Sequence, residues 1–343
     1  MGNKKKVLLA MSGGVDSSMS SKILLDRGFD VHGVYMKLHE FEAKHKENIR
    51  KASKVAAFFG FKFDVLDKRA EFQKEVFDAF IQTYKEGRTP NPCTLCNRII
   101  KFGALLEEAD KRECDFMATG HYVRTDNQFF YEAKDKTKDQ SYFLFNVKKE
   151  VLKRLIFPLS EMEKIDVKRI ASGFEEIAEL ATQRESAEIC FVEGDYTEVL
   201  KQYFPIEQVG DVLDDNGSVI GSHKGYMQYT IGKRKGFRVD GAKDPLYVKR
   251  ILPSTNQIVV ADKARIYEKE FAVRDLNLFF EPKESEFRAQ IKVRYRNDKT
   301  PGTVFLSGGE ALVTLDSEEF AIAPGQAAVF YENDKLLGGG YIV

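Results

Sequence analysis

The stretch Val-Leu-Leu-Ala-Met-Ser-Gly-Gly-Val-Asp-Ser-Ser, residues 7–18, joins an apolar run to two glycines and three serines. Its pattern predicts a strand over 7–11, a glycine turn, and a helix near 17–27 that ends at Gly28. Paired glycines let the main chain approach a ligand closely. The serines add hydroxyl donors, and the free amides and positive end of the helix favour an anion. We therefore expect the loop at 12–17, called the glycine loop below, to bind the phosphates of a nucleotide.

Asp16 is the unusual residue of the glycine loop. A carboxylate beside phosphates is expected mainly where a divalent cation lies between them. The loop has no Gly-Lys-Ser/Thr, which excludes a Walker-type site, and it lacks the spaced glycines of a dinucleotide fingerprint. A plain glycine turn between a strand and a helix is the alternative.

The strand and helix pattern of the first residues recurs further along the chain. Apolar runs at 31–36, 63–66 and 116–119 predict strands, and apolar spacing within 49–59, 72–84 and 99–109 predicts helices. Strands that alternate with helices favour a parallel sheet with right-handed crossovers, whose ligands bind beyond the C-terminal strand ends. Met11, Met36 and Gly120 fall at such ends. The fold class expected for this part is α/β.

The later part of the chain has a different texture. Residues 139–186 are expected to be mostly helical, with a capping box at 160–163. From about 210, short strands and glycine turns predict a small middle module. After about 265, alternation at 288–296, with further strands at 303–306, 311–315 and 327–331, predicts an antiparallel barrel or sandwich. The domains expected are 1–200, 201–265 and 266–343.

Size and composition limit the class of protein. A chain of 343 residues exceeds the size of one core, so two or three domains are expected. It is 43% hydrophobic and 31% charged, and no apolar stretch approaches the ~18 residues that span a bilayer. No signal peptide is recognisable, so we expect a cytoplasmic protein without a membrane partner.

Charge is balanced over the whole chain, with 53 basic and 53 acidic residues. A nucleic-acid surface must therefore come from local clustering. Lys292, Arg294 and Arg296 alternate, so they are expected to share one strand face, either over a phosphate backbone or simply in solvent. The run 233–235 has the same ambiguity.

Four cysteines do not form a disulfide framework in so long a chain, and they are candidates for sulfur, redox or metal chemistry. Cys93 and Cys96 precede a helix expected to begin near Asn97, and the helix end and Arg98 should favour thiolate. A zinc site completed by the distant Cys190, or an incidental packed pair, is the alternative. Cys114 is expected to be a buried core residue.

Several motifs occur in a characteristic order: Ser-Gly-Gly-Val-Asp-Ser at 12–17, Asn-Pro-x-x-x-Cys-Asn at 91–97, Gly-His-Tyr at 120–122, Lys-Asp-Gln-Ser-Tyr-Phe-Leu at 138–144, Cys-Phe at 190–191, and Gly-Tyr through Thr-Ile-Gly-Lys-Arg at 225–234. This order resembles the tRNA-specific 2-thiouridylase family over nearly the whole chain. The first motif alone indicates only the wider ATP-pyrophosphatase superfamily. The resemblance implies a PP-loop ATP-pyrophosphatase domain, a middle module, and a C-terminal barrel that binds tRNA.

The resemblance also implies a reaction. Family members adenylate the C2 oxygen of the wobble uridine, U34, with ATP and then replace that oxygen with sulfur. Cys190 would carry a persulfide, Cys96 would be the partner thiol, and the pair would end as a disulfide. A cysteine desulfurase or a sulfur-relay protein would donate the sulfur. ATP with Mg²⁺ is assigned to Ala10, Met11, Ser12, Gly13, Gly14, Val15, Asp16, Ser17, Met36 and Gly120.

Contacts with the tRNA anticodon stem-loop and its target base are implied for a further set of residues. The base must leave its stack to reach the pocket, at modest cost in a single-stranded loop. A satisfied core or capping histidine is the alternative for one member of the set, His121. The set is Asn91, Pro92, Cys93, His121, Lys138, Asp139, Gln140, Arg294, Tyr295 and Gln326.

One position departs from the family. Many members have Asp where this chain has Cys93, so the role of that Asp does not carry over. Cys93, Cys96 and Cys190 would make a three-thiolate set, suited to a [4Fe-4S] cluster with one open iron, in place of or beside the persulfide. Two other functions are alternatives: a PP-loop adenylating synthetase that acts on a small metabolite, and a non-catalytic RNA-binding protein that uses nucleotide as a structural ligand.

Overall fold

The computed structural model describes residues 4–182, 189–192, 194–242 and 244–343. The chain divides into two compact units. Unit 1 comprises Met1–Val76, Cys93–Phe191 and Asn333–Leu337, and unit 2 comprises Phe77–Pro92, Val192–Glu332 and Gly338–Val343. The chain passes between the units several times, and unit 2 includes a helical segment from the first part of the sequence. Residues 183–186 of the expected helical stretch lie outside the description.

Unit 1 is built on a five-stranded sheet in which every pairing is parallel. Its order is β3-β2-β1-β4-β7, with β1 (Lys6–Ala10), β2 (Asp30–Lys37), β3 (Lys62–Asp67), β4 (Phe116–Ala118) and β7 (Leu155–Ile156). This confirms the predicted parallel α/β sheet. The strand order reverses between β1 and β4, and parallel sheets of this kind bind their ligands beyond the C-terminal strand ends at such a switch point. The glycine loop follows β1, and Gly120 follows β4.

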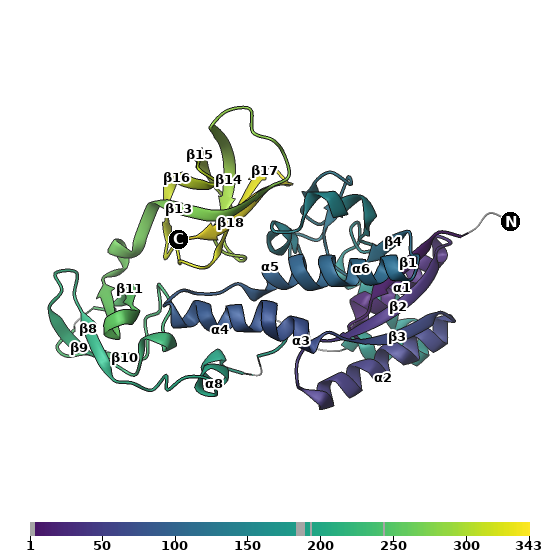
Figure 1. The fold of residues 1–343 in the computed structure, drawn as a ribbon, viewed down its shortest axis with the longest axis horizontal. Coiled ribbons are helices and arrows are strands. Elements are labelled where there is room, and N and C mark those ends of the chain that lie inside the picture. The colour runs from purple at the N-terminus through teal and green to yellow at the C-terminus, as the bar shows by residue number, and fades with distance from the viewer. Residues whose placement is uncertain (1–3, 183–188, 193, 243) are drawn as a thin grey trace. The chain divides into compact units, whose positions relative to one another are not determined.

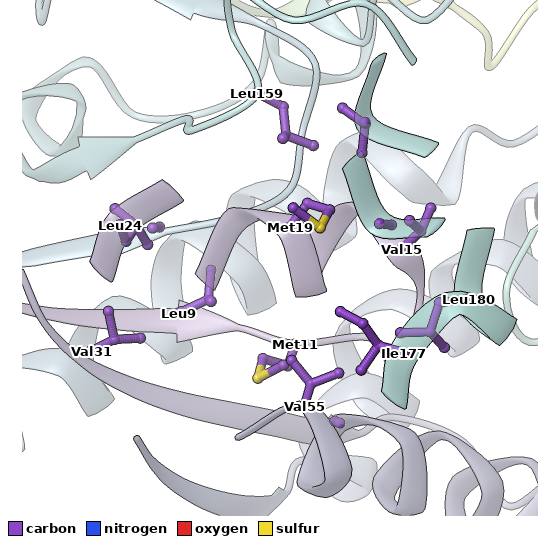
Figure 2. Packing of buried hydrophobic residues seen from close by; sticks show 14 of the residues in the cluster. Leu9, Met11, Val15, Met19, Leu24, Val31, Val55, Leu159, Ile177 and Leu180 are labelled. Atoms are coloured by element: carbon purple, nitrogen blue, oxygen red, sulfur yellow. The ribbon is translucent and has the colours of Figure 1, made fainter. Parts of the chain in front are cut away.

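One face of this sheet carries a continuous apolar core, in which α1 (Val15–Asp26), α2 (Glu42–Phe59), α7 (Lys164–Ser172) and the 3₁₀ helix η5 (Glu175–Thr182) take part. Figure 2 shows Met11, Val15, Met19, Val55, Ile177 and Leu180 from this cluster. The predicted helices at 17–27 and 49–59 are confirmed, and Gly60 ends α2 in a left-handed conformation, with φ of 77°. The glycine loop therefore joins two elements, β1 and α1, whose side chains are both packed in this core.

Two long helical segments each contain a π-helical stretch. The first consists of α3 (Arg69–Phe72), η1 (Gln73–Phe77) and α4 (Asp78–Lys85), and the second of α5 (Pro92–Cys96), η2 (Asn97–Ala104) and α6 (Leu105–Lys111). Figure 1 shows both as near-continuous helices. Helices were predicted here from 3.6-residue spacing, and that is correct for their ends. The π turns are not visible in such spacing, and they are frequent at functional sites.

The stretch from 139 to 182 is mostly helical, as predicted, but most of its helical residues belong to 3₁₀ helices rather than α-helices. It holds two 3₁₀ helices, η3 (Ser141–Leu144) and η4 (Lys149–Arg154), and the edge strand β7 before α7 begins. The predicted capping box at 160–163 is wrong, because Ser160 lies in a turn and α7 begins at Lys164 without a side-chain cap. The short hairpin β5 (Arg124–Thr125) and β6 (Phe130–Tyr131) was not predicted.

Unit 2 contains the helix α8 (Tyr196–Lys201) and a mixed five-stranded sheet of order β10-β9-β8-β12-β11. The sheet covers a small core of Val212, Tyr229, Val248, Ile258 and Val260. This is the predicted middle module. Its strands are β8 (Gly210–Leu213), β9 (Val219–His223), β10 (Phe237–Val239), β11 (Tyr247–Leu252) and β12 (Gln257–Ala261).

The C-terminal part of the chain forms the predicted antiparallel barrel. Its strands are β13 (Tyr267–Leu278), β14 (Glu286–Lys292), β15 (Thr300–Ser307), β16 (Glu310–Phe320), β17 (Ala327–Glu332) and β18 (Lys335–Ile342). The barrel closes because β13 pairs with β16 along one side and with β18 along the other. Within the residues that the structure describes, we find no helix that is both long and apolar enough to cross a membrane.

Candidate active site

The glycine loop of unit 1 is held in shape by its own serines. Ser12 N donates to Ser17 Oγ at 3.1 Å, and the hydroxyls of Ser17 and Ser18 donate to the Gly14 carbonyl at 3.1 and 2.9 Å. These hydroxyls therefore fix the turn rather than point outward as free donors. Gly14 is the N-cap of α1 and makes no side-chain cap, so the first amides of α1 have no partner within the helix. They remain available for an anion.

The two glycines of the loop have different roles. Gly13 has φ of 78°, and a Cβ there would lie 2.7 Å from the backbone oxygen of Asn48. Gly14 has φ of −96°, and its nearest contact would be Ser12 Oγ at 3.4 Å. From β4, Gly120 comes so close that a Cβ would lie 3.1 Å from Ser17 N. The structure therefore brings Gly120 to the loop at the sheet's switch point, while Met36 lies one residue before the end of β2.

Asp16 is engaged by two side chains from later in the sequence. Lys164 Nζ lies 2.5 Å from Asp16 Oδ2, and Tyr122 Oη donates to Asp16 Oδ1 at 2.8 Å. The Lys164 side chain is 10% exposed and that of Asp16 is 32% exposed, so the ion pair is largely shielded from solvent. A cation therefore does lie beside Asp16, and it is an ammonium group of the protein. Sequence reasoning missed Lys164 because nothing in its surroundings distinguishes it from a surface lysine.

The thiols of unit 1 correct the prediction of ready thiolates. Cys96 is buried, Cys93 is partly buried, and burial raises their pKa values to about 12 and about 11. Cys190 is an exposed residue, yet loss of water around its thiol also raises its pKa. Arg98 does not serve the thiols as expected, since its guanidinium donates to Asn146 Oδ1 at 2.6 Å. Desolvation thus outweighs the helix end.

Two lysines oppose this effect. The ammonium of Lys101 lowers the pKa values of Cys93, Cys96 and Cys190, and the ammonium of Lys44 lowers that of Cys190. Interactions with Cys190 also raise the pKa values of Cys93 and Cys96, so the structure brings these three cysteines into one electrostatic neighbourhood. The fourth, Cys114, is buried as predicted. Neither lysine was singled out from the sequence.

His121 is bound on both sides of its ring. Thr119 Oγ1 lies 2.7 Å from Nδ1, and Lys101 Nζ lies 3.4 Å from Nε2. Burial and the charge of Lys101 hold the pKa of His121 well below its usual range. Because an ammonium has no lone pair, Nε2 is the acceptor and Nδ1 carries the proton. His121 is therefore a neutral imidazole in contact with the Lys101 ammonium.

The segment at 138–140 is mainly tied to its own unit. Asp139 is buried and accepts hydrogen bonds from Ala133 N at 2.9 Å and Ser141 Oγ at 2.7 Å. Gln140 Oε1 accepts from Tyr122 N at 2.9 Å. These contacts fix the loop that carries Lys138, and they connect it to the tyrosine that holds Asp16.

In unit 2, Gln326 Nε2 donates to the carbonyls of Thr89 and Pro90 at 3.1 and 3.0 Å. The structure thus brings Gln326 to the stretch that leads into Asn91 and Pro92. These residues lie in unit 2, whereas the cysteines lie in unit 1.

The predicted basic strand face at 292–296 is wrong. β14 ends at Lys292, and Arg294, Tyr295 and Arg296 lie in the turn that follows. Arg294 Nη2 donates to the carbonyl oxygens of Ile231 and Ala321, so its guanidinium joins the middle module to the barrel. Lys292 Nζ lies 5.8 Å from the centre of the Tyr295 ring. Three cations therefore do not share a strand face.

The predicted zinc and iron–sulfur sites need several ligand side chains close together. Across the parts of the chain that the structure describes, no three His, Cys, Asp or Glu side chains form a group that could hold a metal ion. All four cysteines fall within these parts. Cys93, Cys96 and Cys190 therefore do not form a cluster site as they are arranged here.

Three family models together match almost the whole chain. Residues 5–194 match the tRNA methyl transferase HUP domain, residues 197–262 the tRNA methyl transferase PRC-barrel domain, and residues 268–342 the aminomethyltransferase beta-barrel domain. The fold and the site thus define an α/β protein of the HUP class with two β modules after it.

Curated relatives identify the family within this class. The chain is 51% identical to the tRNA-specific 2-thiouridylase MnmA of a Nitratiruptor species over 339 residues, 99% of each chain. It is 50% identical to that of Sulfurimonas denitrificans, over 98% of each chain. It is 48% identical to that of Campylobacter jejuni, over 98% of this chain and 99% of the relative. The chain belongs to the tRNA-specific 2-thiouridylase family.

Proposed function

We propose that this chain is a tRNA-uridine 2-sulfurtransferase, which uses ATP to replace the C2 oxygen of the wobble uridine, U34, with sulfur. One observation carries the proposal: unit 1 combines a glycine loop at the switch point of its sheet with three thiols in one electrostatic neighbourhood. A PP-loop synthetase for a small metabolite would need the loop but not the thiols. A non-catalytic RNA-binding protein that uses nucleotide as a structural ligand would likewise need the loop but not the thiols.

The residues assigned to ATP in this proposal are Ala10 to Ser17, Met36 and Gly120. Gly13 and Gly120 allow close backbone packing, and the first amides of α1 can bind phosphate oxygens. ATP transfers its adenylyl group to the C2 oxygen and releases pyrophosphate, so that the adenylated oxygen becomes a leaving group. Mg²⁺ would enter with the nucleotide, and Asp16 would be its protein ligand, because it is the acidic side chain of the loop. Lys164 holds Asp16 in place and adds a positive charge near the phosphates.

The sulfur step is assigned to Cys190 and Cys96. A cysteine desulfurase or a sulfur-relay protein transfers a sulfur atom to Cys190, which gives a persulfide. Its terminal sulfur, as the anion, attacks C2 of the adenylated uridine, and AMP leaves. The Cys96 thiolate then attacks the Cys190 sulfur and breaks its bond to the transferred atom. The products are 2-thiouridine and a Cys96–Cys190 disulfide, which an external dithiol must reduce before the next cycle.

The anticodon stem-loop of tRNA is the proposed partner, with U34 splayed out of its stack. Asn91, Pro92, Cys93, His121, Lys138 to Gln140, Arg294, Tyr295 and Gln326 are the proposed contacts. Arg294 and Asp139 would act largely by shaping the surface, since both are engaged with protein groups. A cytoplasmic location is proposed because the tRNA substrate is found there.

The test is mass spectrometry of nucleosides from tRNA incubated with the protein, ATP, Mg²⁺ and a sulfur donor. We expect 2-thiouridine from the wild type, none from Cys96→Ser or Cys190→Ser, and ATP binding in both variants. Cys114→Ser is the matched control, because Cys114 is a buried thiol outside the proposed site, and it should keep thiolation. Thiolation by either site variant would contradict the assignment. ATP turnover that requires a small metabolite and ignores tRNA would favour the synthetase.

No step is assigned to a [4Fe-4S] cluster, because the three thiols do not form a metal site in this structure. Cys93→Asp tests this choice, since Asp is the residue of many family members. The persulfide route predicts that Cys93→Asp retains thiolation. Loss of thiolation in this variant, together with iron in anaerobically purified wild type, would replace the persulfide route with the cluster.

A further inference from the structure

The sulfur step proposed above requires negative charge on two sulfur atoms. The persulfide on Cys190 must be an anion to attack C2, and Cys96 must be a thiolate to release the product. Burial opposes the charge at Cys96 and the surrounding protein opposes it at Cys190. The site therefore needs a cation that faces both sulfur positions.

Among the described residues, the ammonium groups of Lys44 and Lys101 lower the pKa values of these thiols. They do not act on the same thiols. Lys44 acts on Cys190 alone, and its Nζ is bound to the Cys190 carbonyl oxygen at 2.9 Å. Lys101 acts on Cys93, Cys96 and Cys190. Lys101 is thus the one ammonium, within the part of the chain described, that reaches every thiol of the neighbourhood.

The π-helical stretch η2 explains how Lys101 comes to face the thiols. Cys96 is the last residue of α5, and Lys101 follows five residues later within η2. In an α-helix, residues five apart point about 140° away from each other. A π-helix joins residues five apart by its hydrogen bonds, which turns them toward the same side of the helix. A regular α-helix would therefore turn Lys101 away from Cys96.

His121 explains how the ammonium stays there. The Nε2 lone pair of neutral His121 accepts from Lys101 Nζ at 3.4 Å, and Nδ1–H donates to Thr119 Oγ1 at 2.7 Å. Phe102, the neighbour of Lys101 on η2, packs against the imidazole with ring centres 5.7 Å apart. The His121 ring is thus held by hydrogen bonds at both of its nitrogens and by the packing of Phe102. The lone pair of Nε2 therefore holds the Lys101 ammonium in a defined position.

We propose that Lys101 is a positioning residue for sulfur transfer: held by neutral His121, its ammonium stabilises the sulfur anions formed at Cys96 and Cys190. This inference rests on the proposed function and deepens it. It gives His121 a role within the protein, in addition to its proposed contact with tRNA. It also gives the π turn a function, which is to aim the lysine.

The test measures the reactivity of each thiol without tRNA. The full-length protein is treated with iodoacetamide at pH 8, and alkylation rates of Cys96 and Cys190 are obtained by peptide mass spectrometry. Cys114 is the internal reference, because the charges that shift its pKa come from other residues, namely Lys6, Arg112, Asp30 and Asp115. Loss of one pKa unit of stabilisation lowers the thiolate fraction tenfold. Since the more basic thiolate is also more nucleophilic, the alkylation rate should fall about 3- to 4-fold.

Three variants give the inference a clear outcome. Lys101→Met should slow Cys96 and Cys190 by about this factor relative to Cys114, whereas Lys101→Arg, which keeps the charge, should stay near the wild type. Lys111→Met is the matched control, because it removes an exposed lysine from the following helix. Unchanged rates in Lys101→Met, or equal slowing of Cys114, would overturn the inference. Equal slowing in Lys101→Arg would also overturn it, because charge would then not be the cause.

Failure of this inference can be told from failure of the proposed function. Wild-type protein that makes 2-thiouridine while Lys101→Met keeps wild-type alkylation rates refutes the role of Lys101 alone. Wild-type protein that makes no 2-thiouridine refutes the function, whatever the alkylation rates. If both hold, Lys101→Met should lower the rate of thiolation with saturating ATP and leave ATP affinity unchanged.

Discussion

The two glycines of the loop look alike in the sequence, and the structure predicts that replacing only one of them, Gly13, lowers the stability of unit 1 strongly. In Gly13→Ala, the new side chain would sit at φ of 78°, 2.7 Å from the Asn48 backbone oxygen and 2.9 Å from its Cα. A left-handed conformation costs an L residue about 1–2 kcal/mol. Crowding in a packed site costs about 1–3 kcal/mol more. We therefore expect Gly13→Ala to lower the free energy of unfolding of unit 1 by about 2–5 kcal/mol.

Gly14→Ala is the matched control. Its backbone is in a conformation that any residue adopts, and its nearest contact is ordinary at 3.4 Å, so we expect a loss below about 1 kcal/mol. The assay is urea unfolding of the nucleotide-free protein, followed by circular dichroism at the helix band, because the long helices α1 and α2 lie in unit 1. The difference corresponds to a midpoint shift of roughly 1–2 M. Equal losses in the two variants would refute the reasoning.

Three further predictions follow from side chains with defined partners. Lys164→Met removes the ammonium beside Asp16 and should lower the free energy of unfolding by about 1–3 kcal/mol, a value between those of exposed and buried ion pairs. A double-mutant cycle with Asp16→Asn should give a coupling energy of about 1–2 kcal/mol, and a coupling of zero would contradict the pairing. Arg294→Met should destabilise unit 2 by about 1–3 kcal/mol, because the Arg294 guanidinium donates to two carbonyl oxygens. Lys292→Met should change the stability little, because Lys292 contacts the Tyr295 ring instead. Thermal unfolding of the two variants measures the difference. Burial raises the pKa of Cys96 to about 12, so the folded protein keeps a proton that the unfolded chain releases. Wild type should therefore lose stability relative to Cys96→Ala as the pH rises above about 8.5, by up to about 1.4 kcal/mol per pH unit, in urea unfolding at pH 8 and pH 10; an unchanged difference would contradict the raised pKa.

The sequence was sufficient for those features that depend on local patterns. Apolar runs bounded by glycine predicted β1, β2 and β3, and their alternation with helices predicted a parallel sheet. Alternation at 303–306 and 311–315 predicted β15 and β16 of the barrel. These predictions succeed because the periods of strand and helix are set by the backbone itself.

Features that depend on distant contacts could not be predicted in the same way. Alternation at 288–296 indicated one long strand, but carbonyls of Ile231 and Ala321 engage Arg294 in a turn after β14. The helix end near Cys96 favoured thiolate, but burial by the rest of unit 1 dominates. Lys101 was missed because a 3.6-residue period turns it away from Cys96, whereas the π turn brings it round toward that residue.

Burial raises the pKa of the Cys96 thiol and the charge of Lys101 lowers it. This balance suits a sulfur-transfer site. At a pKa of about 12, only about one Cys96 side chain in 100,000 is ionised at pH 7. Because oxidation proceeds through the thiolate, the resting thiol is protected from oxidants. The thiolate that does form is strongly nucleophilic, since nucleophilicity rises with pKa. A fixed ammonium stabilises that anion, so Lys101 raises the fraction of Cys96 that can react.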